Sequence, residues 1–119
     1  MAFVYDEANQ CFSMELNNIR FSCVTLDSHF EFVANRLARE YESRLPSIAE
    51  YIVSNDKFLE TYGEISREEL LQMLQEMTIP WIFLKDGNSG TIAYCDSNYV
   101  IEFSFTGDFE NFSDLSIDG

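Results

Sequence analysis

The side chains best suited to chemistry in this chain are the carboxylates of its C-terminal third. After Lys85 the sequence has no lysine or arginine, but it has seven acidic residues: Asp86, Asp96, Glu102, Asp108, Glu110, Asp114 and Asp118. If the last strands and the tail share one surface, these carboxylates form a strongly negative patch. Such a patch could mimic the phosphates of a nucleic acid and occupy a basic active-site cleft. The alternative interpretation is a solvated acidic edge that protects a sheet from pairing with another chain.

The other reactive residue types form no catalytic or metal-binding pattern. Cys11, Cys23 and Cys95 are widely spaced and His29 is the only histidine, so a zinc site of the Cys/His type has no basis. The stretch 86–90 lacks the later ligand positions of a calcium loop, and the glycines form no phosphate-binding motif. We therefore expect no metal, no cofactor and no catalytic residue, and a binding protein rather than an enzyme. A pair of buried carboxylates in a deep pocket would instead favour an enzyme.

Length, composition and charge narrow the class of protein further. The chain has 119 residues, 46% of them hydrophobic, which predicts a single folded domain over residues 1–119. Seven basic residues against 21 acidic ones give a net charge of −14, so nucleic acid and anionic membranes are poor partners and a basic protein is favoured. The same acidity could instead only keep a small protein soluble. The sequence starts without a signal-peptide pattern and has no membrane-spanning apolar run, so we expect a cytoplasmic protein with reduced thiols.

Alternation of apolar and polar residues predicts strands at both ends of the chain. Residues 1–26 alternate in a way that predicts two or three strands, with a tight turn at Asn17 and Asn18. The alternation returns from residue 78 and predicts three more strands. The tail over 108–119 still contains apolar residues, so we expect it to dock on the domain.

Between these strands, apolar residues recur with helical spacing. This spacing predicts helices over about 28–44, 46–62 and 66–75; because of Pro46 the first helix should end or kink near Arg44, and Gly63 should stop the second. The first and third helices each begin with a serine followed three residues later by a glutamate, the pattern of a capping box. The fold class is therefore α+β: an antiparallel sheet of about five or six strands with two or three helices packed on one face, in the order β-β-(β)-α-α-α-β-β-β.

Two aromatic residues near the C-terminal acids are candidate anchors for a partner. Trp81 and Tyr99 lie in predicted strands, where most of the alternating aromatic residues should belong to the core. An aromatic residue that stays exposed among acids would be a binding hot spot. The predicted partner-binding residues are Asp86, Asp96, Glu102, Asp108, Glu110, Asp114, Tyr99 and Trp81.

Several short motifs in residues 11–119 resemble a bacterial family of small acidic domains. They are the segments 65–70 (ISREEL), 77–79 (MTI), 90–94 (GTIAY), 102–105 (EFSF) and 115–119 (LSIDG). The family has no assigned activity, and its members and look-alikes occur among immunity proteins of polymorphic-toxin and contact-dependent growth inhibition systems. The shared motifs are structural, and a Gly-His pair that the family often has in its last strand is replaced here by Phe103-Ser104-Phe105. No role of that histidine is therefore transferred to this chain.

The resemblance implies a cytoplasmic inhibitor that binds and neutralises a cognate bacterial toxin, in particular a basic nuclease. This expectation agrees with the charge, because a nuclease active site must hold phosphates. The alternative hypothesis is a generic protein-interaction or regulatory domain without a toxin partner. The identity of the toxin and the oligomeric state stay open.

Overall fold

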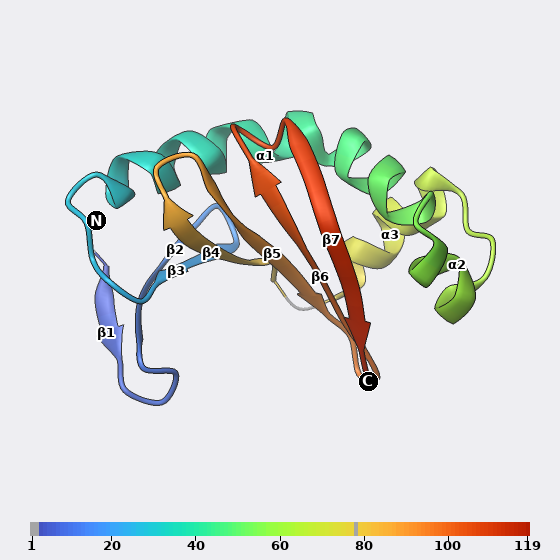
Figure 1. Cartoon of the computed structure of the whole chain (residues 1–119), viewed down its shortest axis with the longest axis horizontal. Helices are drawn as coiled ribbons and strands as arrows, with labels where there is room; N and C mark the ends of the chain where they lie inside the picture. The colour runs from blue at the N-terminus through green and yellow to red at the C-terminus, as the bar shows by residue number, and fades with distance from the viewer. Residues whose placement is uncertain (1–2, 78) are drawn as a thin grey trace.

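The computed structural model describes residues 3–77 and 79–119 and confirms the α+β class (Figure 1). The elements are β1 (Val4–Asp6), β2 (Cys11–Leu16), β3 (Ile19–Cys23), α1 (Phe30–Val53), α2 (Asp56–Tyr62), α3 (Arg67–Glu76), β4 (Trp81–Asp86), β5 (Ser89–Cys95), β6 (Val100–Thr106) and β7 (Asn111–Asp118). The described chain thus forms a sheet of seven strands, slightly more than the five or six predicted.

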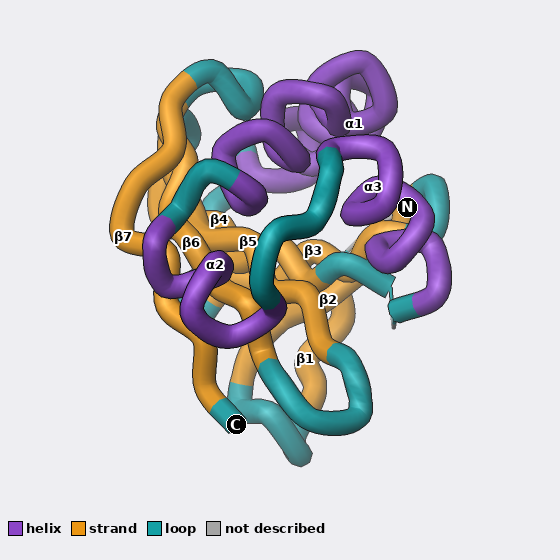
Figure 2. The backbone as a smooth tube through the Cα atoms, turned by 90° about the vertical axis from the view of Figure 1, so that its right-hand side faces the viewer, coloured by secondary structure: helices purple, strands orange, loops and turns teal. Residues whose placement is uncertain are grey.

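The strands lie in the sheet in their order along the chain, from β1 to β7. Neighbouring strands are antiparallel except β3 and β4, which pair in parallel. The parallel pair arises because the three helices carry the chain from the end of β3 back to the other end of the sheet before β4 begins. Figures 1 and 2 show the helices gathered on one side of the curved sheet.

The two faces of the sheet follow the alternation in sequence. In β6, Ile101, Phe103 and Phe105 are buried beneath the helices, whereas Val100 and Glu102 point away from them and are exposed. The opposite side of the sheet, which no helix covers, is called the open face below. Each fully buried Phe or Ile side chain on the helix-covered face contributes roughly 1.5–3 kcal/mol of hydrophobic stabilisation.

The first helix does not end near Arg44, because α1 runs through Pro46 to Val53. Pro46 is exposed, while Ile48 and Ile52 continue the buried stripe that includes Leu37 and Tyr41. A proline inside a helix removes one hydrogen bond, but burial of the whole stripe in the core outweighs that cost. The chain breaks later, where the Asn55 side chain caps α2.

Two predicted helix caps differ in outcome. At α3 the capping box is present: the Glu69 N–H donates to Ser66 Oγ over 3.1 Å, and the Ser66 N–H donates to Glu69 Oε1 over 3.3 Å. At α1 the box predicted from Ser28 and Glu31 is wrong, because the helix begins one residue later, with His29 as its N-cap. Asp27 orders this turn instead, since its Oδ1 accepts the His29 N–H over 2.8 Å.

The β2–β3 turn and the C-terminal tail agree with the sequence predictions. Asn17 and Asn18 have φ of 51° and 62°, as the predicted tight turn requires. The tail docks as predicted, and it does so as an additional strand, β7. Phe109 before β7 and Leu115 within it are buried in the core.

Candidate protein interface

Three of the predicted acids lie together where the β4–β5 and β6–β7 turns meet. The Gly107 N–H donates to the Asn88 carbonyl over 2.8 Å and so joins the two turns. This contact brings Asp86 of the first turn near Asp108 and Glu110 of the second. Asp86 Oδ1 accepts the Asn88 N–H over 2.8 Å, and this bond is the main reason why the pKa of Asp86 is lowered.

Asp108 at this end is neutralised by a base from a distant part of the chain. Arg36 Nε of α1 lies 2.8 Å from Asp108 Oδ1, with both side chains about three-quarters buried. Arg36 Nη2 also donates to the Gly87 carbonyl over 3.3 Å. Arg36 thus ties α1 to both turns, so Asp108 has a structural partner inside the chain.

Asp96 and Tyr99 lie at the other end of the strands, in the β5–β6 turn. Asp96 Oδ1 accepts the N–H groups of Asn98 and Tyr99 over 2.7 and 2.6 Å, and its Oδ2 accepts the Tyr62 hydroxyl of α2 over 3.0 Å. Burial raises the pKa of Asp96, but these three hydrogen bonds outweigh it and lower the pKa. The Tyr62 and Tyr99 rings meet edge to face at 5.5 Å. Asp96 and Tyr99 therefore fasten α2 to the sheet.

Asp114 lies apart from the other acids, on the outer strand β7. It is exposed and adopts a φ of 58°, at the place where the pairing register between β6 and β7 shifts. Burial raises the pKa of Tyr51 of α1, a hydrogen bond with the Leu115 backbone acts against this, and the charge of the Asp114 carboxylate raises the pKa further. An aspartate tolerates this left-handed conformation better than most residues.

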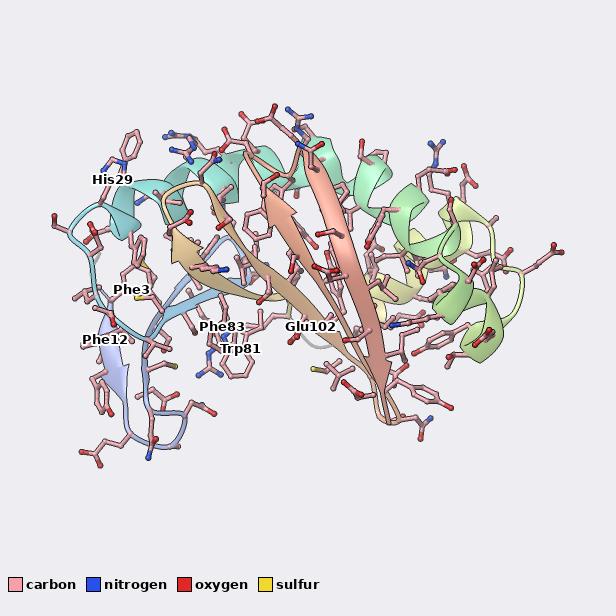
Figure 3. The ribbon with its side chains drawn as sticks, viewed as in Figure 1. Phe3, Phe12, His29, Trp81, Phe83 and Glu102 are labelled. Atoms are coloured by element: carbon pink, nitrogen blue, oxygen red, sulfur yellow. The ribbon has the colours of Figure 1, made fainter. Side chains whose placement is uncertain are left out.

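Trp81 and Glu102 share the open face of the sheet. The pairing register places Arg20, Trp81, Ala93 and Glu102 side by side on β3, β4, β5 and β6. Glu102 is exposed and Trp81 is half-buried, and Figure 3 shows both residues with Phe83. The predicted site residues thus occupy two turn ends, one edge and one face, and they do not form a single patch.

Sequence reasoning missed the acids that the helices add to the same half of the molecule. The stretches 45–66 and 86–119, here called the acidic half, comprise the second part of α1, α2 and the strands β5 to β7. These elements are in contact: the Tyr51 ring lies 5.3 Å from Phe103 and 5.4 Å from Phe112, and α2 packs on β7. In these two stretches Lys57 is the only lysine or arginine, and the acids are Glu50, Asp56, Glu60, Glu64, Asp86, Asp96, Glu102, Asp108, Glu110, Asp114 and Asp118.

Two hollows in the described part of the chain are lined by residues that form no catalytic arrangement. The larger, about 600 Å³, lies between α1, α3 and the β2–β3 turn; its walls are mostly apolar, with Arg39, Glu42 and Gln75 among the lining residues. The smaller, about 380 Å³, lies beside Phe83 and Lys85. Within the described ranges, no three His, Cys, Asp or Glu side chains are grouped to hold a metal ion.

Comparisons with protein-family models, with curated proteins and with solved structures give no match to this chain. Among the residues that the structure describes, no helix is both long and apolar enough to cross a membrane. The function is therefore argued from the geometry and charge of the chain itself.

Proposed function

We propose that this protein is an immunity-type inhibitor that binds a basic cognate toxin, a nuclease, in the cytoplasm and blocks it by occupation. The observation that carries the proposal is the acidic half: the two stretches that pack together contain eleven acidic residues and one lysine, and Arg36 from outside them pairs with Asp108. A nuclease active site must be basic because it holds phosphates. An acidic protein surface can take the place of that substrate.

The energetics favour recognition through charge. Electrostatic fields of opposite sign steer two proteins together and raise their association rate, and repulsion between like charges disfavours binding to the wrong partners. Desolvation offsets part of each buried ion pair, so only a few close pairs, each with a coupling of about 1.5–7 kcal/mol, would dominate the affinity. Asp96 and Asp108 already have internal partners, so we assign this role to exposed acids such as Glu102, Asp114 and Asp118.

The test is co-expression with the protein encoded beside this gene, followed by nuclease assays of that protein on RNA and DNA. We expect the wild-type chain to co-purify with it, to restore growth and to abolish its nuclease activity. If the neighbouring protein binds but is not toxic, the chain is instead a generic interaction domain. If no neighbouring protein binds, the proposal is wrong.

A pair of charge reversals tests whether the acidic half steers the encounter. Glu60→Lys with Asp118→Lys changes two exposed acids of α2 and β7. We expect the association rate to fall at least ten-fold at low salt, because the field of the acidic half weakens. The matched control, Glu68→Lys with Glu76→Lys on α3, has the same net charge but lies outside the acidic half. Equal association rates for the two pairs would contradict the steering argument.

A further inference from the structure

The open face of the sheet has the composition of a protein-binding surface. Two large aromatic side chains, Trp81 and Phe83, lie on it, at neighbouring outward positions of β4. Phe83 is bordered on the neighbouring strands by the short side chains of Ser22 and Thr91, whereas Trp81 lies between Ala93 and Arg20, whose guanidinium packs on its ring. Short hydroxyl side chains also lie farther out on the same face, at Ser13, Ser104, Ser113 and Ser116.

The aromatic pair is already fixed in one arrangement. The Trp81 and Phe83 rings stack with centroids 4.8 Å apart, and the indole Nε1–H donates to Ser22 Oγ over 2.7 Å. The Arg20 guanidinium lies 4.3 Å from the Trp81 ring centroid and is itself held by Asp6 at 2.7 Å. A partner that binds here therefore orders few additional side chains, and the entropic cost of binding is small.

Acidic side chains flank the aromatic pair on the same face. Glu102 lies two strands from Trp81 in the row that the register defines, and Glu15 lies opposite Arg20 on the other side. Arg20 is the base within this row and is neutralised by Asp6, while Lys85 is exposed at the next outward position of β4 beyond Phe83. A rigid aromatic centre with carboxylates at its rim suits an arginine-bearing surface, because a guanidinium packs on aromatic rings and binds carboxylates.

We propose that the basic partner docks on the open face, with Trp81 and Phe83 as its anchor and Glu102 as the acceptor for an arginine of the partner. This inference rests on the proposed function and names its contact surface. A second copy of the chain fits poorly, because each copy carries a net charge of −14 and would bring its own rim carboxylates against those of its equivalent. Charge complementarity therefore selects a cationic protein.

The single tryptophan of the chain provides a local reporter for the test. The emission of Trp81 is measured while a blocked hexa-arginine peptide is added at about 0.15 M salt, where the Debye length is about 8 Å. We expect a saturable change in emission. Glu102→Gln should weaken the binding of the peptide at least three-fold, as monitored by Trp81.

A matched variant separates the local carboxylate from net charge. Glu76→Gln removes the same charge from an exposed position on α3, which lies on the helix-covered side of the sheet and outside the acidic half. We expect Glu76→Gln to change the peptide affinity less than two-fold.

The outcomes distinguish this inference from the proposed function. If calorimetry shows that the peptide binds but Trp81 emission does not change, or if both variants weaken binding equally, the open face is not the docking surface and the inhibitor proposal stands. If the wild-type chain blocks its toxin and the peptide does not bind at all, the inference is wrong as well. If the chain neither binds the peptide nor blocks a neighbouring toxin, both proposals are wrong.

Discussion

A hydroxyl pair in the core provides the most quantitative prediction from this fold. The hydroxyl oxygens of Tyr41 on α1 and Tyr94 on β5 lie 2.6 Å apart. Tyr94 is fully buried and Tyr41 is 8% exposed. Within the described residues, every buried side-chain nitrogen or oxygen has a hydrogen-bond partner. Removal of either hydroxyl would therefore leave the other one buried and unsatisfied.

Removal of one hydroxyl group should lower the free energy of unfolding by more than removal of both. A buried polar group without a partner costs about 1–3 kcal/mol, whereas replacement of both partners by apolar groups is nearly neutral. We expect Tyr41→Phe and Tyr94→Phe each to lower the free energy of unfolding by about 1.5 kcal/mol. The double variant should lose only about 1 kcal/mol in total, which gives a coupling of about 2 kcal/mol between the two sites.

The assay is urea unfolding of the four proteins of this double-mutant cycle, followed by circular dichroism. Tyr5→Phe is the matched control, because Tyr5 is 51% exposed and does not belong to the buried core. We expect the control to change the free energy of unfolding by less than about 0.5 kcal/mol. If the losses of the two single variants simply add in the double variant, the two hydroxyl groups are not coupled and the argument fails.

Three further predictions follow from burial, close packing and capping. Burial raises the pKa of Tyr41 to about 12, while the unfolded residue titrates near 10, so the unfolded chain loses this proton first. The free energy of unfolding should therefore fall by up to about 1.4 kcal/mol per pH unit between those values, measured by unfolding at stepped pH, and Tyr41→Phe should flatten the decline. Gly90→Ala should cost about 3 kcal/mol, since its Cβ would overlap the Phe83 carbonyl oxygen, whereas Gly87→Ala has room and serves as control. Ser66→Ala should lower the free energy of unfolding by about 1 kcal/mol because the α3 cap is lost. Ser66→Asp should restore that stability, and thermal unfolding measures both variants.

Local chemistry explains which elements could be predicted from the sequence. The strand alternation at 101–105, the Asn17-Asn18 turn and the Ser66 cap depend on residues close together in the chain, and the structure confirms all three. The predicted end of the first helix near Arg44 is also a local inference, but core contacts of the fully buried Ile48 and Ile52 override it. Such contacts depend on the tertiary fold and cannot be read from spacing alone.

The seventh strand shows a different obstacle. Phe112, Leu115 and Ile117 all contribute to the core, but they are separated by three and then two positions. The register shift between β6 and β7, where Asp114 has a positive φ, accounts for the uneven spacing. A β-bulge of this kind conceals the two-residue period, so the tail was predicted to dock but not to form a strand.

For the candidate interface, the sequence revealed the surplus of acids but not their placement. The asymmetry of charge after Lys85 could be counted directly. The ion-pair partner of Asp108 could not be predicted, because Arg36 lies 72 positions earlier and reaches Asp108 only through the packing of α1 on the sheet. The hydrogen bond between Tyr62 and Asp96 could not be predicted either, because it depends on how α2 docks on the sheet.

The acids of this chain therefore divide into those that hold the fold and those available to a partner, and this division decides how binding data can be interpreted. Asp96 and Asp108 accept hydrogen bonds from Tyr62 and Arg36, so their replacement perturbs the attachment of a helix to the sheet. Loss of partner binding in such variants would not distinguish a contact from a distortion. Glu102 is exposed in the middle of a paired strand, so its neutral glutamine variant keeps the backbone pairing and changes little except charge. A loss of binding without a loss of stability at Glu102 would therefore identify a contact in the interface itself.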